Sequence, residues 1–133
     1  MKHVLLVEDD PHNAMLIRKL LERRGGFRVT VSESADEVLS LARQGAIDLV
    51  VMDVSLGNTH LEGRPINGLD LSRLIKTHPH SVHVPVVLAT AHAMRGDAET
   101  LLAESGADGY FAKPIIDHEA FVQYIRTLLS EAA

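Results

Sequence analysis

The sequence predicts an α/β protein in which helices cover both faces of a five-stranded parallel sheet. Short apolar runs alternate with segments of helical spacing, and three of the runs are continuously apolar, as strands buried on both faces are. The chain has 133 residues, of which 46% are hydrophobic and 23% are charged. This length and composition are typical of one globular domain, so we expect a single domain over residues 1–133.

Each expected strand is followed by an expected helix. The strands are predicted at residues 4–7, 29–31, 49–52, 84–89 and 109–112. Helical spacing is clearest around four apolar residues: Ile17, Val38, Leu71 and Val122. A weaker helix is expected at residues 97–105, because Gly96 lies at its start.

Residues that begin and end helices agree with these boundaries. Asp10 followed by Pro11 has the order of an N-cap and a first helical position. Gly25, Gly26 and Gly106 are typical of helix ends. The sequence therefore predicts five strand–helix units in succession.

Polar residues follow four of the predicted strands. In a parallel sheet the carboxyl ends of the strands share one edge, where the ligands of α/β proteins gather. The residues expected at that edge are Glu8, Asp9 and Asp10 after the first strand, Asp53 after the third, Thr90 after the fourth, and Lys113 and Pro114 after the fifth. We expect these four loops to line one rim.

The residue types on this rim predict a phosphoryl-transfer site that needs a cation. Several carboxylates in one pocket repel one another unless a cation neutralises them, and an all-oxygen site with few protein ligands suits Mg²⁺. With Mg²⁺ and the ammonium group of Lys113 offsetting charge, Asp53 can attack phosphorus. The Thr90 hydroxyl can bond a phosphoryl oxygen, and the small Ala91 leaves room for the group. Asp10 is assigned to helix capping.

Charge, cysteine content and hydropathy exclude several other classes. The net charge is −5 without a run of Lys or Arg, so no direct nucleic-acid binding is expected. The chain has no cysteine, which excludes disulfides, a thiol nucleophile and Cys-based zinc sites. No apolar segment has the length of a membrane span, so we expect a cytoplasmic protein with no membrane contact. His78, His80 and His83 surround prolines in a connector, and we expect solvated side chains there rather than a metal site.

Four motifs, LLVEDD, LVVMD, VVLATA and GADGYFAKP, occur in this order with suitable separations. Together they make nearly the whole chain resemble the receiver domain of two-component response regulators. The resemblance implies a flavodoxin-like sheet of order 2-1-3-4-5. It also implies phosphoryl transfer to Asp53 from a histidine kinase or a histidine phosphotransfer protein. Such a domain catalyses only its own phosphorylation and dephosphorylation.

The resemblance also implies a role for each matching residue of the metal site. Asp9 would be the direct Mg²⁺ ligand beside Asp53, and Glu8 an outer ligand that acts through water. Ser55, two residues after Asp53, would coordinate through its backbone carbonyl.

A second group of residues would carry the switch. Thr90 would be the switch hydroxyl, and Lys113 the phosphate partner before a cis proline. Tyr110 would be the aromatic side chain that reports phosphorylation, although half-buried packing is its simpler interpretation. His92, two residues after Thr90, either faces the phosphoryl group or is a solvated loop residue.

One loop departs from the pattern. The family has a proline about four residues after the phosphorylated aspartate and a glycine about eight after it; here Gly57 and Gly68 stand at the corresponding places, and the loop is about seven residues longer. Two interpretations of residues 57–67 stay open. The segment is either disordered, or Leu61 and Ile66 hold it against the domain so that it covers part of the rim near Asp53.

Other classes fit less well. A phosphatase of the haloacid dehalogenase type would need a second aspartate where Ser55 stands, and an FMN carrier would need a Ser/Thr-rich first loop. A receiver-like scaffold that is never phosphorylated remains an alternative. The last expected helix runs to about Ser130, so we expect no effector domain in this chain and signalling through an unknown protein partner. Two interpretations stay open, a free-standing regulator, which the start at Met1 favours, and a receiver cut from a longer protein.

Overall fold

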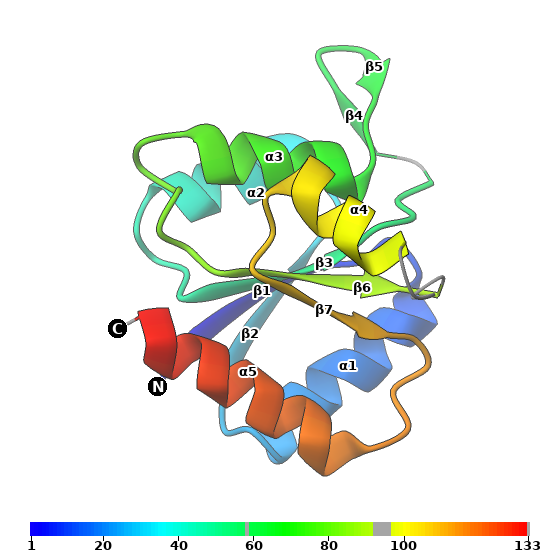
Figure 1. Cartoon of the computed structure of the whole chain (residues 1–133), viewed down its shortest axis with the longest axis vertical. Helices are drawn as coiled ribbons and strands as arrows, with labels where there is room; N and C mark the ends of the chain where they lie inside the picture. The colour runs from blue at the N-terminus through cyan, green and yellow to red at the C-terminus, as the bar shows by residue number, and fades with distance from the viewer. Residues whose placement is uncertain (58, 92–96, 133) are drawn as a thin grey trace.

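The main sheet is parallel and five-stranded, so the predicted fold class is confirmed. In the computed structural model, which describes residues 1–57, 59–91 and 97–132, all pairs in this sheet are parallel. Its strands are β1 (His3–Val7), β2 (Arg28–Ser32), β3 (Leu49–Asp53), β6 (Val86–Thr90) and β7 (Gly109–Ala112). Their order is β2-β1-β3-β6-β7, which is the flavodoxin-like order (Figure 1).

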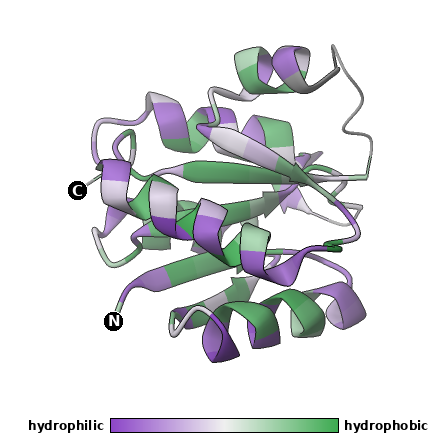
Figure 2. Cartoon of the chain, turned by 60° about the horizontal axis from the view of Figure 1, so that its bottom comes forward, coloured by the Kyte–Doolittle hydropathy of each residue, from purple (hydrophilic) through white to green (hydrophobic). Residues whose placement is uncertain are grey.

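Helices cover both faces of the sheet. One layer holds α1 (Pro11–Arg23) and α5 (His118–Ala132), and the other holds α2 (Ala35–Arg43), α3 (Gly68–Thr77) and α4 (Asp97–Ser105) (Figure 1). Side chains alternate along β1: Leu5 and Val7 pack with the second layer, whereas Val4 and Leu6 pack with the first. The strands are correspondingly hydrophobic while the helices are mixed (Figure 2). None of the helices described is long and apolar enough to cross a membrane.

The predicted helix boundaries at both ends of α1 are confirmed. The Asp10 side chain accepts hydrogen bonds from the backbone N–H of His12 at 2.9 Å and of Asn13 at 3.4 Å. After the helix, Gly26 has a φ of +70°, a conformation that favours glycine. Gly106 ends α4 in the same way with a φ of +69°.

The start of β6 was predicted wrongly. We expected a strand from residue 84, but it begins at Val86. The N–H of Val84 donates to the carbonyl of Ser81 at 3.0 Å, within the turn after α3, and Pro85 has no N–H to give to a ladder. An apolar run alone does not separate a buried turn residue from a strand residue.

The extended loop contains a small hairpin that the sequence did not predict. Strands β4 (His60–Leu61) and β5 (Arg64–Pro65) pair in antiparallel fashion, and the turn between them has a φ of +53° at Glu62 and +81° at Gly63. The hairpin rises from the side of α2 and α3, away from the sheet (Figure 1). Gly63 therefore lies in the turn of the hairpin, whereas Pro65 lies in β5 opposite His60.

Candidate functional site

The carboxyl ends of four strands bring the predicted site residues to one edge of the sheet. Glu8 and Asp9 directly follow β1, and Asp53 is the last residue of β3. Thr90 ends β6, and its carbonyl accepts a hydrogen bond from the backbone N–H of Lys113 at 2.9 Å. Glu8, Asp53 and Thr90 are all at least 95% buried. The rim therefore has the composition that the sequence predicts.

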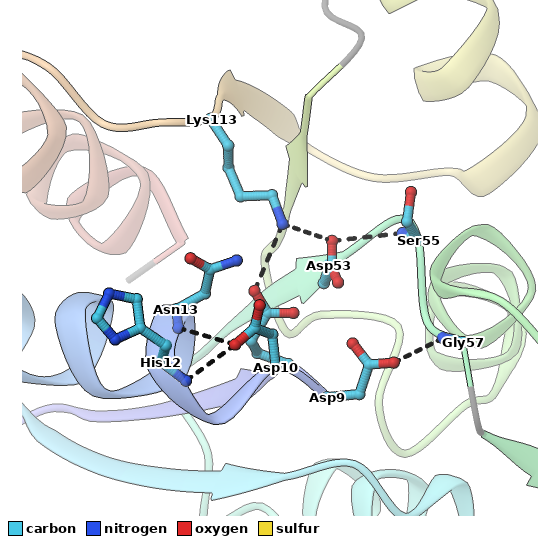
Figure 3. Close-up of polar contacts among 9 residues, drawn as sticks. Asp9, Asp10, His12, Asn13, Asp53, Ser55, Gly57 and Lys113 are labelled. Carbon is cyan, nitrogen blue, oxygen red and sulfur yellow. Dashed lines mark hydrogen bonds and ion pairs between the residues drawn. The ribbon is translucent and has the colours of Figure 1, made fainter.

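A group of three carboxylates and one ammonium group lie at the centre of this rim. Oxygen atoms of Glu8, Asp9 and Asp53 lie within 4.8 Å of one another. Among the described residues, these three carboxylates are close enough together to hold a metal ion. The Nζ of Lys113 lies 2.9 Å from Oδ1 of Asp53 and 3.4 Å from Oε1 of Glu8 (Figure 3). His78 and His80, whose rings are 5.5 Å apart, do not join it.

Burial and mutual interaction shift the pKa values of these groups. Burial, reinforced by hydrogen bonding to Asp53 and by repulsion from its charge, raises the pKa of Glu8 to about 7. Burial also raises the pKa of Asp53, but hydrogen bonds with Glu8 and Lys113 and the charge of Lys113 outweigh it and lower the pKa. Burial lowers the pKa of Lys113, but its hydrogen bonds and its attraction to both carboxylates outweigh burial, so the pKa of Lys113 is raised overall. Asp53 is therefore an ionised carboxylate beside an ammonium group at neutral pH.

The donor set fits Mg²⁺. Oε2 of Glu8 is fully buried and accepts no hydrogen bond from any residue in the described part of the chain. Buried acceptors are normally paired, so an orphaned carboxylate oxygen beside two further carboxylates suits a hydrated cation. On the side of Asp53, the N–H of Ser55 donates to Oδ1 at 3.3 Å, which places the Ser55 backbone at the same site (Figure 3).

Gly57 is a site residue that the sequence did not reveal. Its backbone N–H donates to Oδ2 of Asp9 at 2.6 Å and so links the loop after β3 to the loop after β1 (Figure 3). A proline, which the family pattern has here, could not donate this bond. The departure at position 57 was visible in the sequence, but its partner 48 residues away was not.

Gly68 holds α3 against the phosphoacceptor strand. A Cβ atom at this position would overlap the carbonyl group of Asp53, and the N–H of Gly68 donates to the carbonyl of Val54 at 3.2 Å. This close approach needs glycine, which is consistent with matching Gly68 to the family's glycine after the longer loop.

The two switch residues, Thr90 and Tyr110, lie on β6 and β7, the last two strands at one edge of the sheet. Tyr110 on β7 is 37% exposed, which agrees with the half-buried packing expected of it. Its backbone N–H donates to the hydroxyl of Tyr124 at 3.1 Å. The peptide bond between Lys113 and Pro114 is cis, as the resemblance implies. His92 lies outside the described residues.

The extended loop packs on the domain through its apolar side chains. Ile66 is buried with 9% exposed, and Leu61 packs beside Leu39 of α2 and Leu74 of α3. The hydroxyl of Thr59 also donates to the carbonyl of Glu33 at 3.1 Å. Leu61 and Ile66 thus hold the loop as the second interpretation expects, but against α2 and α3. Gly57, at the base of the loop, contacts the carboxylate group.

Comparison with known proteins assigns the family. The family model described as "Response regulator receiver domain" matches residues 4–126 of the chain. The chain belongs to the response regulator receiver family. It is 34% identical over 131 residues to the polar-differentiation response regulator DivK of Brucella ovis, and the match covers 98% of each chain. The DivK protein of Brucella anthropi is 33% identical with the same coverage.

Solved structures of receiver domains agree with this fold. The receiver domain of a Pseudomonas aeruginosa sensor histidine kinase, with a magnesium ion coordinated in its active-site cleft, has a TM-score of 0.80 and 28% identity and covers 97% of this chain and 98% of its own. A response regulator structure from Chloroflexus aurantiacus has a TM-score of 0.81 and 26% identity with the same coverage. The chain is therefore a receiver domain of the kind used in two-component signalling.

Proposed function

We propose that this receiver domain accepts a phosphoryl group on Asp53 from a histidine kinase or a histidine phosphotransfer protein in a Mg²⁺-dependent reaction. The observation that carries the proposal is the 2.9 Å contact between Nζ of Lys113 and Oδ1 of Asp53, beside the carboxylates of Glu8 and Asp9. A buried, ionised carboxylate paired with an ammonium group and a cation-binding set is what attack on phosphorus needs.

In the proposed reaction an Asp53 oxygen forms a bond to phosphorus as the bond between phosphorus and the donor's imidazole nitrogen breaks. The nitrogen keeps the electron pair, so no further reactant is required. Lys113 offsets the charge of the phosphoryl oxygens, and Thr90 donates its hydroxyl to one of them. Bound Mg²⁺ supplies additional charge neutralisation, and Asp9, Asp53 and the Ser55 carbonyl would hold it, with Glu8 acting through water.

The output of the proposed reaction is a change of surface. Phosphorylation would draw Thr90 toward Asp53 and let Tyr110 turn inward from its present, partly exposed position, which alters the surface of α4, β7 and α5. Residues 1–133 would act as one cytoplasmic domain that signals through contact with another protein. The DivK regulators, which the chain matches over 98% of their length, support a regulator of this size.

The alternative functions have less support. For an aspartate-nucleophile phosphatase, position 55 would have to supply an acid, but Ser55 supplies a backbone N–H to Asp53. A scaffold that is never phosphorylated would not require the ion pair between Lys113 and Asp53 at the centre of a carboxylate group.

Intact-mass measurement tests the proposal. Acetyl phosphate with Mg²⁺ is expected to add one phosphoryl group to the wild type and to Asp10→Asn, the control that changes only a helix cap. Asp53→Asn and the wild type in EDTA are expected to remain unlabelled. Labelling of Asp53→Asn at the wild-type rate, or an absence of any EDTA effect, would contradict the assignment; an absence of labelling by every donor would favour the scaffold.

A further inference from the structure

An apolar pocket opens beside the carboxylate rim, between α1 and the loop after β7. It has a volume of about 420 Å³. Its wall is formed mainly by Leu16, Ile17 and Leu20 of α1 and by Ile115. Leu16 is 56% exposed, so the pocket is reached from solvent. A pocket of this size and lining is typical of small-molecule sites.

One end of this pocket reaches the phosphoacceptor. Ala91, which directly follows Thr90, and Lys113 both line it. The Nζ of Lys113 is in turn 2.9 Å from Oδ1 of Asp53. Asn13 also lines the pocket, and Figure 3 shows its side chain between α1 and Lys113. The cavity therefore reaches the ammonium group of Lys113 at the end near Asp53 and is apolar along α1.

We propose that this pocket binds the acyl chain of acyl phosphates, so that the domain takes phosphoryl groups from longer-chain acyl phosphates in preference to acetyl phosphate. The inference rests on the proposed function of Asp53. An acyl phosphate has the matching polarity, with an anionic head for Lys113 and an apolar tail for Leu16, Leu20 and Ile115. The acetyl group is too short to gain much from these side chains.

The chemistry needs no additional reactant. An oxygen of Asp53 forms a bond to phosphorus while the bond between phosphorus and the acyl oxygen breaks. The leaving group departs as a carboxylate with the electron pair. Only the binding of the chain beyond the reacting atoms distinguishes one donor from another, so the preference appears in kcat/KM.

Labelling rates with acetyl and butyryl phosphate, read by intact mass, test the inference. We expect kcat/KM to be about 3- to 15-fold higher for butyryl phosphate, because each buried methylene contributes up to about fourfold. Leu16→Asn should bring the ratio of the two donors to about one. Met15→Asn is the matched control: Met15 is 54% exposed on the same helix but does not line the pocket, so the ratio should persist.

Each outcome decides between the two proposals. Labelling by acetyl phosphate with a wild-type ratio of one would overturn the pocket assignment and leave Asp53 as the acceptor. Equal loss of preference in Leu16→Asn and Met15→Asn would also overturn it. If Leu16→Asn slowed only transfer from a phosphohistidine protein, the pocket would instead be assigned to that partner protein. Labelling by neither donor would overturn both proposals.

Discussion

The loops after β1 and β3 both deliver carboxylates to the same edge of the sheet, but they are built differently. The loop after β1 is short, and Asp10 turns it directly into α1 with hydrogen bonds two and three residues away. The loop after β3 is long and is fixed by distant partners: Gly57 bonds to Asp9, and Leu61 packs on α2 and α3. Local chemistry therefore shapes one half of the rim, and tertiary packing shapes the other.

The largest expected effect tests the packing side of this comparison. Gly68→Ala places a Cβ atom against the carbonyl of Asp53 and should lower the free energy of unfolding by about 2–4 kcal/mol. Urea denaturation would measure it. Gly63→Ala is the control: no atom beyond its two chain neighbours lies within 4 Å of the added Cβ, so only the strain of its φ of +81° remains, about 1 kcal/mol. Equal costs would show that the contact at Gly68 is easily relieved.

The second prediction separates the two adjacent aspartates of the β1 loop. Asp9→Ala should weaken Mg²⁺ binding by about tenfold or more, because it removes a carboxylate from the metal group. Asp10→Ala should leave Mg²⁺ affinity within about twofold and instead cost about 1 kcal/mol of stability, because it removes the cap of α1. Calorimetric Mg²⁺ titration and urea denaturation in EDTA measure the two effects. Equal losses of affinity would contradict this division of roles.

The third prediction concerns pH. The pKa of Glu8 is raised from 4.5 to about 7 in the folded protein, so the folded state holds the proton more tightly than the unfolded state. Without metal, the stability that this proton contributes is present below pH 4.5 and is lost as pH rises through 7. In EDTA at pH 8, the free energy of unfolding of Glu8→Gln should therefore exceed that of the wild type by about 1–2 kcal/mol. This difference in stability should narrow toward pH 5. A gap independent of pH would refute the cause.

The smallest effect is expected at the hairpin. Leu61→Ser should lower stability by about 1 kcal/mol through lost apolar burial on α2 and α3. The rate of labelling by acetyl phosphate should stay within about twofold, because Leu61 packs on the apolar core under α2 and α3. His60→Ser, at an exposed position on the same strand, should change neither quantity. A large change in labelling with Leu61→Ser would mean that the hairpin acts on the rim after all.

The same contrast explains what the sequence predicted. Strand order, the cap at Asp10 and the gathering of Glu8, Asp53 and Lys113 follow from local patterns and from the geometry of parallel sheets. The packing of Leu61 on the core and the Gly57 bond depend on contacts between residues far apart in the chain, which a single sequence does not encode in any local pattern. The hairpin itself is local, since His60 pairs with Pro65 across a short turn. The partial exposure of Tyr110 follows from the fold in another way, because β7 is an edge strand whose residues alternate between core and solvent.

The bond between Tyr124 and the N–H of Tyr110 bears on the exposed edge of the sheet. An edge strand offers unpaired backbone groups to strands of other molecules, and β7 is such an edge. Tyr124 reaches its bond only because Gly109 has no side chain; a Cβ atom there would collide with the Tyr124 hydroxyl. The Tyr124 hydroxyl of α5 thus accepts a hydrogen bond from one N–H of the edge strand. A strand from a second copy of the protein therefore finds no free N–H at this point.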